Sequence, residues 1–305
     1  MWNSKVFHKK KWLILLKVCL NLFILITIIF ILWNKKYNLN HLFNLYLILV
    51  ISFEFIILFL ISSRILMLSH ALKQNISLKD IYRITITTKF YNMVFPSVVA
   101  EVIRGIKYYL AGIKDKYNIM FLVIFDRIIG FITFFIIFII SAFLLKFHEF
   151  DRIVMVFLWV LLFLVFIIAL FNMDKIRRFL NHKDFFIHLS KKTLFFTMGI
   201  SLIAQMGIIF KYFFIFRVIV DIDFDFIHTV YICSASHLSQ IIPFSTGIFT
   251  VKDGVLFFTL SKGKGDYNSA LNLMAILGVM ELFIGIVGGI WESMGIMKKV
   301  ISHHE

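Results

Sequence analysis

The sequence is poor in the charged residues that a water-soluble domain displays on its surface. Only 16% of its 305 residues are charged, whereas 61% are hydrophobic and 17% are aromatic. The mean hydropathy is +0.93, and a soluble core of this size cannot hide so much apolar surface. The composition therefore excludes a soluble globular protein and leaves no room for a soluble catalytic domain.

Cysteines and known catalytic loops are also scarce. The two cysteines, Cys19 and Cys233, lie far apart inside apolar runs, so neither a disulfide nor a zinc site is indicated. No phosphate-binding Gly-rich loop, nucleophile elbow or long repeat occurs in the sequence. We expect no metal ion and no cofactor.

Long apolar runs, by contrast, are abundant. A membrane-spanning helix needs roughly 20 apolar residues, and suitable runs lie at about 12–33, 44–63, 118–146, 153–172, 194–219 and 269–296. The first run is longer than a signal-peptide core and lacks a small-residue cleavage site. The sequence therefore predicts an all-α polytopic membrane protein with about six full spans.

Two further regions, at about 82–111 and 227–262, are apolar but interrupted by polar residues and proline. The only two prolines of the chain, Pro96 and Pro243, lie one in each region. Proline lacks an N–H and restricts the residue before it, so it begins helices more readily than it continues them. We predict two re-entrant broken-helix pairs, with Ser97 and either Ser245 or Thr246 as helix N-caps.

The charge balance indicates a membrane topology. The 32 Lys and Arg exceed the 17 Asp and Glu by 15, which in a soluble protein would suggest nucleic acid, but basic residues also collect in cytoplasmic loops. With a cytoplasmic N-terminus, 20 basic residues fall inside and six outside. We expect a multi-pass membrane protein with both termini on the cytoplasmic side and no nucleic-acid partner.

This topology makes the two broken pairs enter the membrane from opposite sides. Interrupted apolar segments at corresponding places in two halves are typical of inverted repeats that hold a midplane binding site. We predict one domain, 1–305, whose first half is about 12–146 and whose second half is about 153–296.

The two breaks have similar polar residues at the same spacing. Ser97 precedes Arg104 by seven residues, and Ser245 precedes Lys252 by seven, a rise of about 10.5 Å that keeps each pair on one helix face. Two half-helix N-termini that face each other present free N–H groups to an anionic oxygen such as phosphate. Alternatively, the serines only cap helices and the cations lie at the membrane interface.

Three other polar residues fall inside apolar segments: Glu54, Glu281 and His237. A carboxylate at membrane depth faces a cavity, finds a basic partner or is protonated. The candidate partners are Arg127 or Arg104 for Glu54, and Lys211 or Lys252 for Glu281. The sequence leaves open whether these residues form structural ion pairs or couple protons, and whether His237 titrates or is only hydrogen-bonded.

The residues around both breaks resemble the motifs of a known family. Asn92 to Arg104, with Pro96 and Glu101 between them, is similar to the motif N…lP…GE..R of the flippase-like membrane domain, typified by the transmembrane part of lysylphosphatidylglycerol synthase. Pro243 to Asp253, with Ser245, Gly247 and Lys252, resembles the second motif, P.S.GG.G..RE. The stretch Asp126 to Gly130, which contains Arg127, looks like the arginine region of the next span. Ala100, Ile248 and Thr250 depart from family glycines.

The resemblance covers nearly the whole chain and implies a protein that moves or handles lipids. Together with the two half-helix N-termini, it predicts that the headgroup of an anionic phospholipid or polyprenyl phosphate binds at Asn92, Ser97, Glu101, Arg104, Arg127, Ser245, Gly247, Lys252 and Asp253. It also implies a location in the cytoplasmic membrane. The cytosolic aminoacyl-transferase domain of some members does not follow the last span, so we do not expect an enzyme. The alternatives are a membrane-embedded transferase and an accessory subunit of an enzyme of envelope lipid or glycan synthesis.

Overall fold

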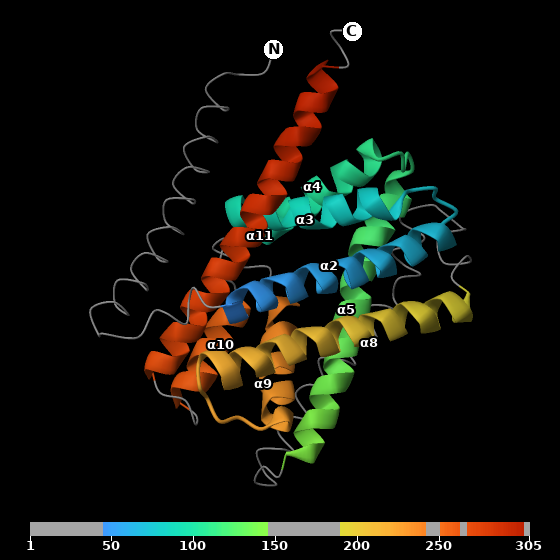
Figure 1. Ribbon diagram of the computed structural model, residues 1–305. Coiled ribbons are helices and arrows are strands. Elements are labelled where there is room, and N and C mark those ends of the chain that lie inside the picture. The colour runs from blue at the N-terminus through green and yellow to red at the C-terminus, as the bar shows by residue number, and fades with distance from the viewer. Residues whose placement is uncertain (1–44, 146–189, 242–250, 263–266, 302–305) are drawn as a thin grey trace.

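The fold is helical throughout the residues that the structure describes. The computed structural model describes residues 45–145, 190–241, 251–262 and 267–301 (Figure 1). Its eight α-helices in these ranges are α2 (Leu45–Ala71), α3 (Leu78–Val94), α4 (Ser97–Leu110), α5 (Lys116–Leu144), α8 (Lys191–Phe214), α9 (Phe226–Leu238), α10 (Val251–Lys262) and α11 (Tyr267–Ile301). A π-helix, η2 (Ile215–Ile219), extends α8, and a 3-10 helix, η3 (Ser239–Ile241), follows α9. The predicted all-α fold class is confirmed.

Four of these helices are long and apolar enough to cross a membrane. They cover Tyr46–Ala71, Lys116–Leu144, Lys192–Ile219 and Tyr267–Met294, and so they match four of the predicted spans. The other two predicted spans, 12–33 and 153–172, lie outside the described residues. The structure is thus that of a polytopic membrane protein.

The predicted break at Pro96 is present. Phe95 is extended, with φ −118° and ψ 161°, and α4 begins directly after the proline. Ser97, however, is the first residue of α4, and Pro96 itself takes the N-cap position with no side-chain hydrogen bond. The prediction that Ser97 caps this helix is therefore wrong by one position. The second break, with Pro243, Ser245 and Gly247, lies outside the described residues.

Helix α4 is amphipathic and separates two environments. Its outer face exposes a stripe of large apolar side chains, with Val102 60% and Ile106 53% exposed. On its inner face Arg104 and Tyr108 are only 5% and 1% exposed. A helix with one exposed apolar stripe suits a lipid neighbour on that side, so α4 can stand between bilayer and protein interior.

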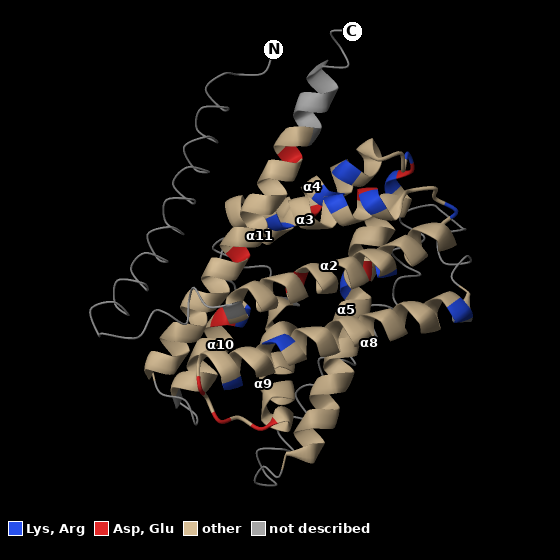
Figure 2. Ribbon diagram, in the orientation of Figure 1, with Lys and Arg blue, Asp and Glu red and all other residues tan. Residues whose placement is uncertain are grey.

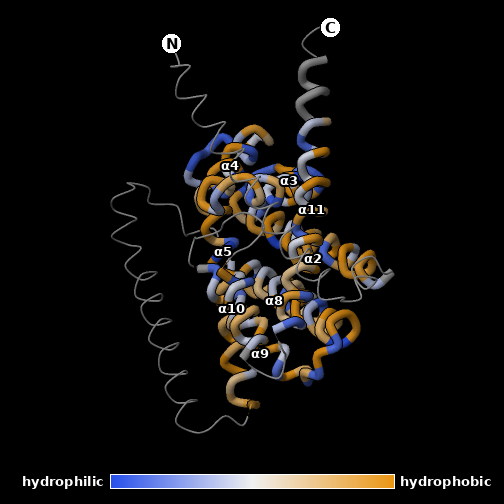
Figure 3. Tube along the Cα trace, turned by 90° about the vertical axis from the view of Figure 1, so that its left-hand side faces the viewer, coloured by the Kyte–Doolittle hydropathy of each residue, from blue (hydrophilic) through white to orange (hydrophobic). Residues whose placement is uncertain are grey.

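The described helices pack against one another mainly in pairs. Helices α2 and α8 lie side by side and run in opposite directions, as Figure 1 shows. Helix α3 packs on α11, and α9 packs on α5. Within each broken pair, α3 contacts α4 and α9 contacts α10. In the view of Figure 3, apolar segments extend along most of the described helices.

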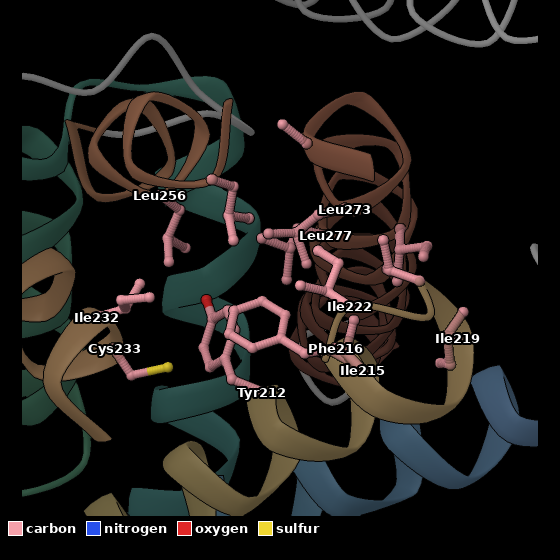
Figure 4. Close-up of a cluster of buried hydrophobic side chains, with 14 of the residues drawn as sticks. Tyr212, Ile215, Phe216, Ile219, Ile222, Ile232, Cys233, Leu256, Leu273 and Leu277 are labelled. Carbon is pink, nitrogen blue, oxygen red and sulfur yellow. The ribbon is translucent and has the colours of Figure 1, made fainter. Parts of the chain in front are cut away.

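The largest buried apolar cluster of the described residues lies mostly in the second half of the chain. It gathers side chains of α8, η2, α9, α10 and α11, including Tyr212, Phe216, Leu256 and Leu273 (Figure 4). Each of these four side chains has no exposed surface. Cys233 lies in the same cluster and is fully buried, in keeping with a packing role for this cysteine.

Gly288 of α11 allows the backbones of α11 and α3 to pack closely together. A Cβ atom added to Gly288 would lie 2.6 Å from the backbone oxygen of Ile86. Because that neighbour is backbone, Gly288→Ala is expected to force α3 and α11 apart and to destabilise the protein by about 1–3 kcal/mol. Thermal unfolding in detergent measures the change. Gly199→Ala on α8 is the control, since no described atom outside its own helix turn lies within 4 Å of its added Cβ. A melting point of Gly288→Ala equal to the wild type's would contradict the close packing.

Candidate functional site

One cavity of about 520 Å³ lies between the described helices. Residues of α2, α3, α4, α5, α8, α9, η3, α10 and α11 line it. Ten of the residues singled out in the sequence are among them: Glu54, Asn92, Ser97, Glu101, Arg104, Arg127, His237, Lys252, Asp253 and Glu281. Residues that are far apart in the sequence are thus gathered around one space, whereas Ser245 and Gly247 lie outside the described residues.

Charged residues occur within the apolar helices as well as at their ends (Figure 2). Among the described residues, the cavity lining includes six basic side chains and five carboxylates. Charges at membrane depth are costly and usually functional. The ion pairs among them therefore decide how much positive charge is left for a ligand.

The first group of charges centres on Asp126 of α5. Its Oδ1 atom accepts hydrogen bonds from Arg64 Nε and Nη2 at 3.0 and 2.5 Å, and its Oδ2 atom accepts one from Arg104 Nη1 at 3.3 Å. All three side chains are buried, with at most 6% of each exposed. A buried carboxylate shared by two guanidinium groups leaves net positive charge at this end of the cavity. We call these three residues the arginine cluster.

Glu101 extends the arginine cluster toward solvent or lipid. It forms ion pairs with Arg104, at 2.9 Å between Oε2 and Nε, and with Arg127. The Arg127 side chain is 51% exposed, and that of Glu101 is 17% exposed. Of the three arginines here, Arg127 therefore has the most freedom to move toward a ligand.

The second group of charges centres on Glu54 of α2. Lys211 of α8 donates to its Oε2 at 2.6 Å, and Lys89 of α3 lies 3.4 Å from its Oε1. Lys89 also lies 3.3 Å from Oε1 of Glu281 on α11. These ion pairs join α2, α3, α8 and α11. We call the four residues, Glu54, Lys89, Lys211 and Glu281, the lysine cluster.

The lysine cluster corrects the predicted partners of both glutamates. Glu54 pairs with Lys211 and Lys89, so the predicted pairing with Arg127 or Arg104 is wrong. Glu281 pairs with Lys89, where Lys211 or Lys252 was the prediction. Sequence reasoning missed Lys89, which lies inside α3, and Arg64, which lies inside α2. Neither residue belongs to the motifs at the two breaks, and only the packing of the helices brings them to their acidic partners.

Lys252 of α10 is buried against Tyr212 and its own neighbour. Its Nζ donates to the Tyr212 hydroxyl at 3.2 Å and lies 3.4 Å from Oδ1 of Asp253. His237 is close by, stacked on Phe134 with ring centroids 4.6 Å apart and edge-on to Tyr212. The aromatic rings hold this part of the wall in place, and Lys252 is 7% exposed.

The two clusters lie at opposite ends of the contact between α2 and α8. Arg64 donates to Ser201 at 2.7 Å, and ten residues away on each helix Glu54 accepts from Lys211. Ten residues of helix correspond to about 15 Å along the axis. The wall between the clusters is largely apolar, with Ile57, Ile61 and Ile208 among its residues. The cavity therefore has two charged ends and an apolar middle on this side.

Comparisons with known proteins agree with the resemblance seen in the motifs. A family model described as "Lysylphosphatidylglycerol synthase TM region" matches residues 12–289. The searches of curated proteins and of solved structures gave no match.

Proposed function

The chain belongs to the family of the lysylphosphatidylglycerol synthase transmembrane region, and from this premise we propose that it is a lipid translocase. In this proposal the cavity binds the anionic headgroup of a phospholipid or polyprenyl phosphate. The observation that carries the proposal is the gathering of ten motif and intramembrane polar residues around one cavity at the centre of an apolar helical protein.

The electrostatics of the cavity favour a phosphate as the bound group. Arg104, Arg127 and Lys252 approach from three different helices, and guanidinium groups bind phosphate oxygens in a bidentate manner. The N-terminus of α4 adds N–H groups, since Ser97 and Val98 of its first turn line the cavity. We propose that the headgroup is held there while the lipid tails remain in the bilayer beside the apolar face of α4.

We further propose that the two halves are inverted repeats. Helix α2 packs against α8, its counterpart in the second half, in the opposite direction. The packing of α3 on α11 corresponds to that of α9 on α5. In this view the lipid moves when the halves rock around the cavity. The protein then lies in the cytoplasmic membrane with both termini inside.

Transport is preferred to chemistry because the two carboxylates that a transferase would use as a base already have basic partners. Glu101 pairs with Arg104 and Arg127, and Asp253 lies 3.4 Å from Lys252. Both carboxylates therefore already serve as ion-pair partners of the basic residues that would hold the headgroup.

Leaflet transfer by the purified protein tests the proposal. Vesicles with a fluorescent phospholipid in both leaflets are treated with a quencher that cannot cross the membrane. Empty vesicles keep the fluorescence of the inner leaflet, and vesicles with the protein are expected to lose most of it. Transfer without another protein excludes the accessory-subunit alternative. No loss beyond that of empty vesicles, by protein that still binds lipid, would overturn the translocase proposal.

A further inference from the structure

Gln205 is a buried polar residue of the cavity that the motifs do not include. It lies on α8, one turn after Ser201, and is 3% exposed. It lines the cavity beside Gly130 of α5, where an added Cβ would lie 3.9 Å from Gln205 Nε2 and 3.8 Å from Arg64 Nη1. Its amide is therefore next to the arginine cluster, where the proposed headgroup binds.

The surrounding hydrogen bonds fix the orientation of this amide. Gln205 Nε2 donates to the backbone oxygen of Gly130 at 2.7 Å and lies 3.3 Å from Ser201 Oγ. Ser201 Oγ also accepts a hydrogen bond from Arg64. The Thr133 hydroxyl donates to the Ile129 carbonyl, so Ser201 is the donor in its contact with Thr133. Ser201 Oγ can therefore only accept a hydrogen bond from Gln205. A flipped amide would place its oxygen against two acceptors. The nitrogen thus faces the protein.

The amide oxygen is consequently the end of the side chain that lacks a hydrogen-bond partner among the described residues. Gln205 Oε1 is buried and finds no donor among the residues that the structure describes. Asn92 Oδ1, also in the cavity lining, is a second buried acceptor of this kind. A buried acceptor without a donor is costly, and the neighbouring cations are already engaged with carboxylates or Ser201.

We infer that the headgroup bound in this cavity carries an O–H or N–H donor in addition to its phosphate, and that Gln205 Oε1 accepts a hydrogen bond from this donor. The inference rests on the proposed function and narrows its substrate class. Headgroups with hydroxyl or primary ammonium groups fit, whereas a fully ionised bare polyprenyl phosphate or a methyl-capped phosphate offers nothing to Gln205 Oε1. A site that hydrogen-bonds a ligand group discriminates strongly against analogues that lack it.

Two pairs of lipids with equal charge test the inference by titration into the detergent-solubilised protein, with bound lipid counted by native mass spectrometry. Phosphatidylglycerol and phosphatidylmethanol are both anionic, and only the first has hydroxyl donors. Phosphatidylethanolamine and phosphatidylcholine are both zwitterionic, and only the first has N–H donors. We expect the wild type to bind the donor-bearing member about tenfold more tightly in at least one pair. The pair that shows the difference identifies the donor as hydroxyl or ammonium.

Gln205→Met keeps the volume of the side chain and removes the acceptor. In this variant the ratio of the affinities for the donor-bearing lipid and its partner in the pair is expected to fall to about one. The affinity for phosphatidylmethanol should stay at the wild-type value, which also shows that the variant is folded. Gln74→Met, at a glutamine in the loop before α3 that is outside the cavity lining, should keep the preference.

Three results would overturn parts of the account separately. Equal binding within both pairs by the wild type, together with weaker binding of all four lipids by Arg104→Ala, overturns the donor inference and leaves the headgroup site standing. A preference that persists in Gln205→Met overturns the role of Gln205. Failure of the wild type to bind any of the four, with Arg104→Ala no different, overturns the headgroup site itself.

Discussion

Asp126→Asn is expected to be among the most destabilising single substitutions in the described part of the chain. It preserves the shape of the side chain but removes the charge that compensates Arg64 and Arg104, both 5% exposed. Breaking a buried ion pair by removing one partner typically costs about 3–5 kcal/mol, because a buried charge is left uncompensated. The shift of the unfolding transition in detergent, relative to the wild type, measures this loss.

A surface pair provides the matched control. Asp223 is 87% exposed in its ion pair with Arg217, and exposed pairs contribute only about 0–1 kcal/mol. Asp223→Asn should therefore unfold close to the wild type. If Asp126→Asn also unfolded close to the wild type, the arginine cluster would not be a buried network.

The same geometry predicts a partial rescue. In Asp126→Asn, Arg104 keeps its ion pair with Glu101, while Arg64 keeps only uncharged partners among the described residues, namely the Ser201 hydroxyl and the amide oxygen at position 126. The double variant Arg64→Met, Asp126→Asn should therefore be more stable than Asp126→Asn alone. A double variant less stable than the single one would show that Arg64 is not the uncompensated charge.

The second large effect is expected on lipid binding. Arg104→Ala with Lys252→Ala removes a cation from each half of the chain at the cavity wall. Hydrogen bonds to charged groups are the stronger ones, so retention of anionic lipid through purification should fall about tenfold or more. Mass spectrometry of the lipids that remain with the purified protein measures it.

Lys107→Ala is the control for this double variant. Lys107 lies on α4 like Arg104, but it pairs with Glu292 and does not line the cavity. Its substitution should leave the retained lipids unchanged. An unchanged lipid profile in the Arg104, Lys252 double variant would instead mean that these cations serve the structure alone.

The features that the sequence predicted well are those with a local cause. The length of the apolar runs alone located the four described spans, because the hydropathy of a segment depends only on the residues of that segment. Pro96 located the first break because its missing N–H and its steric effect on Phe95 act on neighbouring residues. Ser97 and Arg104 of α4 also line the cavity together, as their seven-residue spacing on one helix face required.

The charge pairing could not be predicted in this way. Glu54 meets Lys211 across 157 residues of sequence, and only the antiparallel register of α2 and α8 brings them together. The predicted span at 44–63 ended before Arg64 because an uncompensated arginine ends an apolar segment. In the structure α2 continues to Ala71, since Asp126 of α5 compensates that charge.

The location of a bound headgroup tests the central claim most directly. A phospholipid with a photoreactive diazirine in its headgroup is bound to the wild type, illuminated, and the modified residues are identified by peptide mass spectrometry. Adducts on the inner face of α4 around Glu101 and Arg104, and on α8 around Gln205, are the predicted result. Adducts confined to the outer face of α4, at Val102 and Ile106, would contradict a headgroup site in the cavity.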